Sequence, residues 1–281
     1  MDSSKHGAIQ GLPRESFYLA TKVGRNHQCQ FDYSPRGVRE SFETSLRNLR
    51  VESVDLVTIH DYLVTFSISL HFSFTQKYEY FSISEQYRRE GKLRYIGCSG
   101  YPLEPLVNLT ELAKGRLDTC LSYARMTLFN TDLMSSPLIN NSSIGLINAS
   151  PLGCGLLTPD VLSDPPVPYW HPASPDLVAA CQKAAQLCLK EGVNLAKIAT
   201  NFSLTKCPKA ALHLIGMISP AQLENNLSVL KGGLTDQESR IQTEISQMFK
   251  GVKTHWEGVE ITKYRQDPKK FADNLLYGPQ E

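Results

Sequence analysis

The sequence predicts an α/β fold built on a parallel sheet, and two observations carry this prediction. Short apolar runs rich in β-branched residues recur along the 281 residues, and segments with helical spacing of apolar residues separate them. The runs are nearly continuous in apolar residues, which is typical of strands that are covered on both faces. Strands that alternate with helices favour right-handed crossovers onto one parallel sheet.

Six of these apolar runs are predicted to be strands. They are Phe17–Val23, Asp55–His60, Arg94–Ser99, Thr119–Arg125, Gly145–Ser150 and Leu212–Met217. A closed barrel of parallel strands has eight. The visible strands are therefore two short of a closed barrel.

Four helices are predicted from capping residues and apolar stripes. Ser34 can cap the first, and Pro35 suits its first helical position. Ser174 caps the second, which stops at Gly192. The four segments are SPRGVRESFETSLRNL, SPDLVAACQKAAQLCLKEG, SPAQLENNLSVL and TDQESRIQTEISQMF. The inward stripe of the first comprises Val38, Phe42, Ser45, Leu46 and Leu49.

The segment from Phe66 to Ile83 does not fit the alternation of strands and helices. It reads FSISLHFSFTQKYEYFSI, with large apolar residues at every second position over its first half, which predicts a strand. A parallel connection at this point calls for a crossover helix, of which Glu85–Glu90 supplies only the last turn or two. We interpret the segment as a poorly fitting replacement and favour this over a new functional element.

Composition excludes several classes of function. A net charge of +1 provides no global field for nucleic acid or anionic lipid. No apolar run approaches the roughly 20 residues that span a bilayer, and the first residues lack the apolar core of a signal peptide. Seven scattered cysteines, with no Cys-x-x-Cys pair, fit reduced thiols and argue against structural zinc. We expect a cytoplasmic protein without a metal centre.

One charged residue stands out at the end of the first predicted strand. In SFYLATKVGR, Lys22 follows an apolar run, and burying an unpaired ammonium group costs several kcal/mol, roughly, even after relaxation. Lys22 either reaches water, as long cationic side chains usually do, or has a dedicated partner. Both interpretations stay open at this point.

Several motifs in a fixed order resemble the aldo-keto reductase superfamily, and within it the L-galactose dehydrogenase-like branch. They are LATKVGR, SPRGVRESFETSLRNLRVESVDLVTIHD, REGKLRYIGCSGYP, LSYARMTLFN, INASPLGCGLL and IGMISPAQLENNL. The resemblance covers residues 11–61 and 85–230, with 62–84 atypical, and implies one domain over 1–281. It implies a (β/α)₈ TIM barrel that is incomplete, with the first two strands absent and the helix after the fourth family strand disrupted.

The resemblance also implies a catalytic set of four residues. The family uses a tyrosine as acid or base, a lysine that lowers the pKa of the tyrosine, an aspartate that pairs with the lysine, and a histidine at the carbonyl oxygen. Lys22 and His60 match the lysine and the histidine. The aspartate and tyrosine belong upstream, and residues 1–15 carry no counterpart, so we expect a chain truncated at its N-terminus. We interpret Asp32 and Tyr33 as turn residues and not as substitutes.

Seven residues match the positions with which the family holds its nicotinamide cofactor. Ser99 would bind the carboxamide, Tyr123 the ring or amide, and Ser150 and Leu152 the pyrophosphate. Ala149 stands where many members stack an aromatic ring on the nicotinamide. The residues that match the adenosine contacts are Ser219, Gln222 and Asn226.

The choice of cofactor depends on Gln222. Many NADPH users place an arginine at this position, where it grips the 2′-phosphate. Glutamine carries no charge to offset that phosphate, so NAD is expected over NADP. Asn225 replaces the usual glutamate of the family, which weakens the adenine contact.

The expected function is that of an NAD(P)-dependent oxidoreductase acting on a small sugar or aldehyde, such as L-galactose oxidised to its lactone. Two alternatives stay open. One is a catalytically inactive barrel fragment that binds nucleotide or a full-length relative, and the other is a product without a stable fold. Neither nucleic acid nor membrane is an expected partner.

Overall fold

The computed structural model describes residues 11–25, 31–60, 74–259 and 262, and side chains of 74–79 are not described. The chain divides into two compact units. Unit 1 comprises Met1–Gly100 and Asn108–Cys120, and unit 2 comprises Tyr101–Val107 and Leu121–Glu281. The prediction of one domain over the whole chain stays a prediction.

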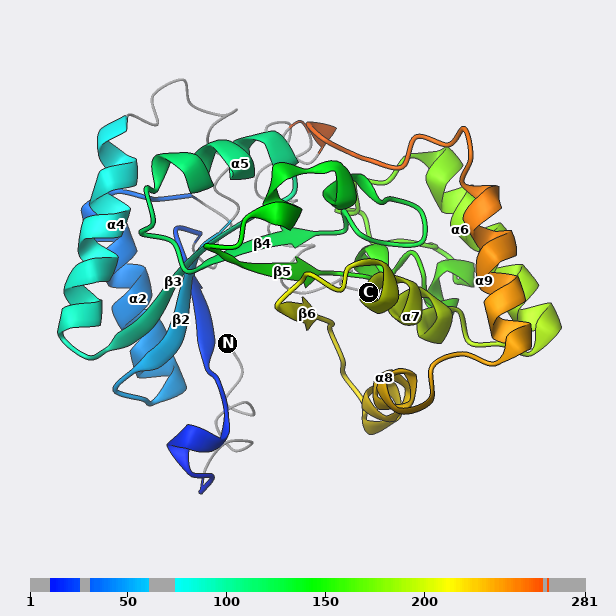
Figure 1. Cartoon of the computed structure of the whole chain (residues 1–281), viewed down its shortest axis with the longest axis horizontal. Helices are drawn as coiled ribbons and strands as arrows, with labels where there is room; N and C mark the ends of the chain where they lie inside the picture. Colours follow the sequence, from blue (N-terminus) through cyan, green and yellow to red (C-terminus); the bar gives the residue numbers. More distant parts are fainter. Residues whose placement is uncertain (1–10, 26–30, 61–73, 260–261, 263–281) are drawn as a thin grey trace. The chain divides into compact units, whose positions relative to one another are not determined.

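Six strands form one sheet in which the strand order follows the chain (Figure 1). They are β1 (Ala20–Val23), β2 (Val54–Ile59), β3 (Leu93–Gly100), β4 (Thr119–Tyr123), β5 (Gly145–Ala149) and β6 (Leu212–Leu214). The pairs β1–β2, β2–β3 and β5–β6 are parallel. All six predicted strands are confirmed, and the α/β class with them.

The two outermost strands are shorter than predicted. β1 starts at Ala20, and the backbone N–H of the preceding Leu19 donates to the Asp55 carboxylate at 2.7 Å instead of to a strand carbonyl. β6 ends at Leu214, three residues before the predicted end at Met217. Strand ends with a partner on one side only have fewer backbone bonds to extend them.

Unit 1 places two helices on one face of β1, β2 and β3. These are α2 (Pro35–Leu49) and α4 (Phe74–Arg89), which pack on each other and on the strands (Figure 1). Ser34 caps α2 as predicted, because its side chain accepts from the backbone N–H of Gly37. Val38, Phe42 and Ser45 of the predicted stripe are buried, whereas Leu46 and Leu49 are half-buried.

The prediction of a strand up to Ile83 is wrong for the residues that the structure describes, because α4 begins at Phe74. The helix after β2 is therefore present, and the expectation that it is disrupted fails over this range. Tyr80, Ser84 and Tyr87 are buried at helical spacing, and the Tyr80 hydroxyl donates to the carbonyl of Gly97 at 2.9 Å. The parallel connection between β2 and β3 requires a crossover, and a helix supplies it here. The alternating residues 66–73 lie outside the described range.

Two further helices were missed from the sequence. They are α5 (Leu103–Leu112) and α7 (Leu195–Lys206). Asn194 caps α7 by accepting from the backbone N–H of Lys197, a start signal that was present in the sequence. The described part of the chain contains no helix long and apolar enough to cross a membrane.

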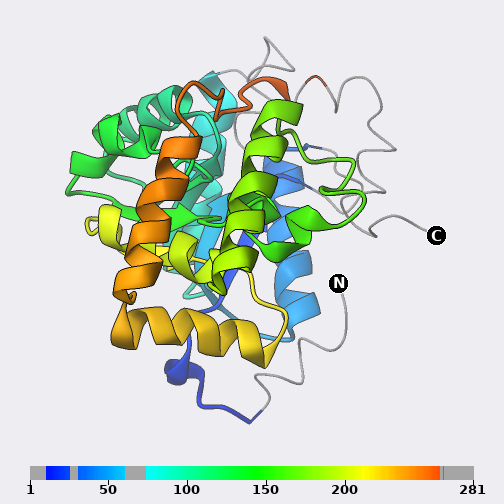
Figure 2. The same ribbon diagram turned by 90° about the vertical axis from the view of Figure 1, so that its right-hand side faces the viewer.

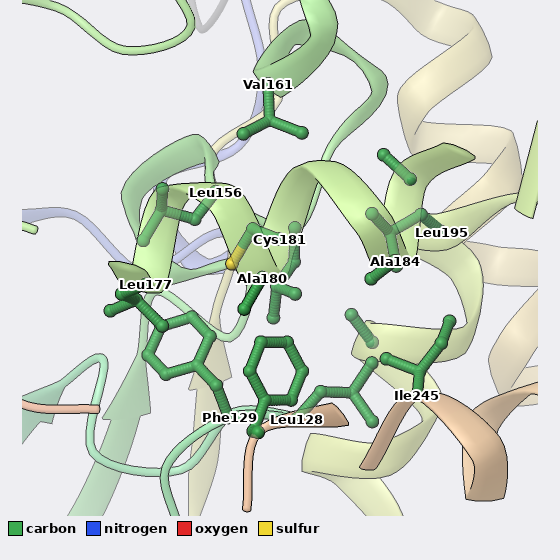
Figure 3. Packing of buried hydrophobic residues seen from close by; sticks show 14 of the residues in the cluster. Leu128, Phe129, Leu156, Val161, Leu177, Ala180, Cys181, Ala184, Leu195 and Ile245 are labelled. Carbon is green, nitrogen blue, oxygen red and sulfur yellow. The ribbon is translucent and has the colours of Figure 1, made fainter. Parts of the chain in front are cut away.

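Unit 2 has its own hydrophobic core, which α6 (Pro175–Glu191), α7 and α9 (Asp236–Met248) share with the loops after β4 and β5. Figure 2 shows α6 and α9 running side by side. Phe129 and Leu128 from the loop after β4 belong to the same buried cluster as Ala180 and Cys181 of α6 (Figure 3).

Within the described ranges, the remaining elements are one helix and five short 3₁₀ turns. Helix α8 (Pro220–Gly232) follows β6, and Ser219 caps it as predicted. Thr235 and Glu238 form a capping box at the start of α9. The 3₁₀ turns are η1 (Arg14–Ser16), η2 (Asp132–Ser135), η3 (Pro137–Asn140), η4 (Gly153–Gly155) and η5 (Pro159–Leu162).

Candidate functional site

In unit 1 the strand register brings three predicted site residues to one face of the sheet. Lys22 pairs with Thr58, and Thr58 pairs with Gly97 on the next strand. Side chains of a strand alternate between faces, so His60 shares the face of Thr58, and Ser99 shares the face of Gly97. All three predicted residues lie at the carboxyl ends of β1, β2 and β3, on the face opposite α2.

Local hydrogen bonds hold this edge of the sheet together. The backbone N–H of His60 donates to the carbonyl of Val23 at 2.9 Å, directly beside Lys22. The Ser99 hydroxyl is buried and donates to the carbonyl of Ile59 at 3.1 Å. Lys22 is exposed and His60 is half-buried. The ammonium group of Lys22 therefore reaches water, which is one of the two interpretations that the sequence left open.

Tyr33 also belongs to this edge, a contact that the sequence did not indicate. Its ring packs so closely on Gly24 that a Cβ there would lie 2.1 Å from Tyr33 Cε1. Its hydroxyl donates to the backbone carbonyl of His60 at 2.5 Å, and the side chain is 3% exposed. Asp32, in turn, accepts from the backbone N–H of Ser34, as a turn residue does. Tyr33 thus fixes the backbone at His60.

The opposite edge of the same three strands carries an ion pair. Asp55 accepts from Arg14 Nη2 at 2.7 Å and from the N–H of Leu19. Burial opposes ionisation of Asp55, yet these two hydrogen bonds outweigh it and hold the pKa of Asp55 below its usual value. A cavity of about 540 Å³ adjoins the pair, at the amino ends of β2 and β3 and away from His60.

In unit 2, Tyr123 at the end of β4 is held by an aromatic cluster. Its ring lies 5.4 Å from that of Tyr101, which stacks on Trp256 at 4.8 Å. The Tyr101 hydroxyl also accepts from the backbone N–H of Trp256 at 3.1 Å. Trp256 is only 2% exposed. The segment after α9 therefore positions one of the predicted cofactor residues.

Arg125 packs on the same aromatic cluster, and the sequence analysis did not identify it as a site residue. Its guanidinium group lies over the Tyr101 ring, 4.8 Å from the ring centroid. Two carboxylates pair with it, Asp132 at 2.9 Å and Glu257 at 2.8 Å. The Arg125 side chain is only 7% exposed, so the arginine is paired as a buried cation must be.

Backbone strain marks the carboxyl ends of β4 and β5. Ala124, Ser150 and Cys154 all have φ between 53° and 57°, although none is a glycine. Left-handed backbone at such residues costs on the order of 1–3 kcal/mol each and gathers at functional sites. The ladder enforces it here, because Ala124 N–H donates to Ala149 O at 2.9 Å and Ser150 N–H to Leu214 O at 3.1 Å.

The chain after Ser150 forms a tight turn. The N–H of Gly153 donates back to the carbonyl of Ser150 at 2.9 Å. A Cβ at Gly153 would lie 2.5 Å from the Phe129 ring, so the turn needs glycine there. Leu152 is half-buried and packs against the core of unit 2. Ser150 and Leu152 thus lie in one turn at the carboxyl end of β5.

Of the three predicted adenosine residues, Ser219 caps α8 and the other two lie on it. The side chains of Ser219 and Gln222 are engaged locally. Ser219 Oγ accepts from the N–H of Gln222 at 3.3 Å. Gln222 Oε1 accepts from the N–H of Ile218 at 2.7 Å, and Asn226 Oδ1 accepts from the Thr200 hydroxyl at 3.4 Å. Ser219 and Gln222 together order the first turn of α8.

The remaining candidate groups are His213, the cysteines and possible metal ligands. His213 lies in β6 as predicted, with its Nδ1 3.2 Å from Asn148 Nδ2, and burial lowers its pKa. None of the cysteines 98, 120, 154, 181, 188 and 207, all within the described residues, forms a disulfide bond. Among the residues that the structure describes, no group of three or more His, Cys, Asp or Glu side chains could hold a metal ion.

Comparison with known proteins places these features in a family. The Aldo/keto reductase family profile matches residues 7–247. L-galactose dehydrogenase from Arabidopsis thaliana is 32% identical over 240 residues, covering 83% of this chain and 70% of that protein. D-arabinose 1-dehydrogenase from Saccharomyces cerevisiae is 28% identical over 232 residues, covering 78% and 66%. NADH-specific methylglyoxal reductase from Escherichia coli is 23% identical over 264 residues, covering 85% and 77%.

These matches confirm the resemblance drawn from the motifs, including its L-galactose dehydrogenase-like branch. The dehydrogenase and reductase relatives support an NAD(P)-dependent oxidoreductase. The individual site residues stay predictions. With a profile that matches most of its length, the chain belongs to the aldo/keto reductase family.

Proposed function

We propose that the protein transfers a hydride between a nicotinamide cofactor and the C1 carbon of an aldose, with L-galactose as the first substrate to test and its lactone as the product. The observation that carries the proposal is the common face of Lys22, His60 and Ser99 at the carboxyl ends of three neighbouring strands. Ligands of parallel α/β folds bind at this edge.

The side chains of unit 1 have complementary roles in this reaction. In the oxidative direction the C1–H bond breaks with both of its electrons going to the nicotinamide, which serves as hydride acceptor. The C1 hydroxyl loses its proton and becomes the lactone carbonyl. His60 binds that oxygen and takes up the proton, and the positive charge of Lys22 stabilises the developing oxyanion. The bond from Tyr33 to the His60 carbonyl holds the histidine backbone in place.

The residues of unit 2 suit a dinucleotide. The tight turn from Ser150 to Gly153 brings backbone, and not a bulky side chain, to the end of β5. The N-terminus of α8 has the partial positive charge that favours a phosphate oxygen. The Tyr101–Trp256 stack fixes the ring of Tyr123, the residue that the family resemblance assigns to the nicotinamide.

NAD is the proposed cofactor over NADP. Gln222 is exposed and uncharged, so it cannot offset the two charges of a 2′-phosphate. The bacterial relative named as an NADH-specific reductase is consistent with this choice.

The test is absorbance at the NADH band with the purified chain, L-galactose or D-arabinose, and NAD or NADP in parallel. NADH formation with either sugar supports the proposal. Absence of both turnover and nucleotide binding, in a chain with a cooperative melting transition, would contradict it.

Cofactor preference has its own matched pair of variants. Gln222→Arg should shift the ratio of NADP to NAD binding toward NADP by about tenfold or more, because a charge-assisted bond to phosphate becomes available. Gln237→Arg adds the same charge to exposed α9 and should leave the ratio unchanged. Tighter binding of NADP than of NAD by the unmodified chain would rule out the assignment.

A second candidate function is nucleotide binding without turnover, and one observation favours it. Tyr33, the phenol that the structure places beside His60, is 3% exposed and donates its proton to a backbone carbonyl. A phenol held in this way is a poor acid or base for substrate. Saturable NAD binding together with undetectable NADH formation would select this candidate.

A further inference from the structure

We propose that two copies of this chain associate through α8, with the two helices antiparallel. The starting observation is an uneven distribution of exposed apolar side chains. Of the thirteen large hydrophobic residues that are exposed in the described part of the chain, seven lie between residues 212 and 230. Exposed apolar surface of this kind marks interaction sites.

The apolar residues of α8 form a stripe. Leu223, Leu227 and Leu230 are spaced i, i+4, i+7 and are 45%, 39% and 69% exposed. Residues at this spacing lie on one side of a helix. Val229 is buried and Asn226 contacts Thr200, so α8 rests on α7 with a different side. The stripe therefore has the spacing of a helix–helix seam without a covering element among the described residues.

The charges beside the stripe select a second copy as its partner. Glu224 and Lys231 are both exposed, seven residues apart, and flank the same side of the stripe. When two such helices run antiparallel, the equivalent flanks face each other, as they do in antiparallel coiled coils. Glu224 of one copy then faces Lys231 of the other, twice per dimer. A two-fold contact requires this self-complementarity.

The strand before α8 also exposes apolar side chains. Leu212 and Leu214 are 51% and 46% exposed and share one face of β6, while His213 points to the face of Asn148. β6 stands at the end of the strand order, and the ends of sheets are prone to association. The inference is independent of the proposed catalytic function.

Sedimentation equilibrium of the purified chain over a range of concentrations tests the proposal. We expect a reversible monomer–dimer equilibrium. Leu230→Glu should weaken dimerisation at least tenfold, about the effect of losing one buried contact in each copy. Leu189→Glu, at a similarly exposed leucine on α6, should leave the equilibrium unchanged.

Charge reversal supplies the decisive control. Glu224→Lys and Lys231→Glu should each weaken dimerisation by about tenfold, because two like-charge contacts replace two pairs. The double variant restores both pairs and should return to the wild-type constant. Failure of the double variant to recover would overturn the antiparallel arrangement. A strict monomer would overturn the proposal, and a lower melting temperature of the Leu230→Glu monomer would show that the chain covers the stripe itself.

Discussion

The strand ends of the two units differ in what they present. In unit 1 the carboxyl ends of β1, β2 and β3 carry Lys22 and Ser99 within the strands and His60 directly after β2. In unit 2 the carboxyl ends of β4 and β5 carry Tyr123, whose ring packs on Tyr101, and the left-handed residues Ala124 and Ser150. Unit 1 presents a lysine and a histidine, whereas unit 2 presents an aromatic ring and left-handed backbone.

This contrast fits a division of work. Acid–base and electrostatic assistance requires charged or titratable side chains at the place where the substrate reacts. A flat, extended cofactor requires close approach of the backbone and few protruding groups. Unit 1 is therefore the side of the molecule where substitutions should change rate, and unit 2 the side where they should change nucleotide affinity.

The largest expected effect is on turnover in unit 1. Lys22→Met removes the charge and keeps much of the bulk, and we expect the rate to fall by about 10²–10³, the range typical of losing one group that stabilises a developing oxyanion. Lys92→Met is the matched control, since Lys92 precedes β3 at the opposite edge and pairs with Glu90. A rate for Lys22→Met equal to that of the control would contradict the proposed role of unit 1 in turnover.

A smaller effect is expected from one carboxylate in each unit. Asp55 holds the amino ends of β1 and β2 in unit 1, and Glu238 pairs with Lys197 at 2.7 Å in unit 2. Asp55→Asn and Glu238→Gln should each lower the free energy of unfolding by about 2 kcal/mol at pH 7, as charged hydrogen bonds are lost. Urea titrations of both variants measure this.

The pH dependence of these two carboxylates has a definite sign. Burial opposes ionisation of Glu238, but the bonds from Lys197 and Thr235 outweigh it and lower the pKa, as for Asp55. Their stabilisation is complete above the usual carboxylate pKa of about 4 and is lost as pH falls through the lowered values. Each variant should lose part of this acid sensitivity. Acid unfolding identical to wild type would contradict the assignment.

The smallest effect compares two strained residues. Ser150 in unit 2 and Arg50 in unit 1, the C-cap of α2, both have φ of 53°. Glycine at either position should raise the free energy of unfolding by about 1 kcal/mol, because the left-handed strain is removed. NAD affinity should fall for Ser150→Gly and stay constant for Arg50→Gly. Equal affinities would mean that the strain in unit 2 has no binding role.

Much of the fold was predictable because strands that are buried on both faces are nearly continuous apolar runs in the sequence. All six strands were identified from apolar runs, and Ser34, Ser174, Ser219 and Thr235 were recognised or placed at helix starts where the structure has caps. The error at α4 came from reading period-two spacing locally, whereas the parallel connection between β2 and β3 imposes a helix from Phe74 onward.

The site was predictable only in part. The alternation of side chains along neighbouring strands is enough to bring Lys22, His60 and Ser99 to one face. The hydrogen bond from Tyr33 to His60 joins residues that are 27 positions apart in the sequence. The ion pair between Arg125 and Glu257 joins residues that are even farther apart in the sequence. Such contacts depend on tertiary packing. No propensity predicts left-handed backbone at Ala124, which the β4–β5 ladder enforces.

The most direct test of the division between units is an NAD titration of Lys22→Met beside its turnover assay. Trp170 and Trp256 both belong to unit 2, so quenching of their fluorescence reports nucleotide binding there. We predict an NAD dissociation constant within about twofold of wild type, a difference of less than 0.5 kcal/mol, together with loss of NADH formation. Loss of NAD binding in parallel with loss of turnover would contradict the account.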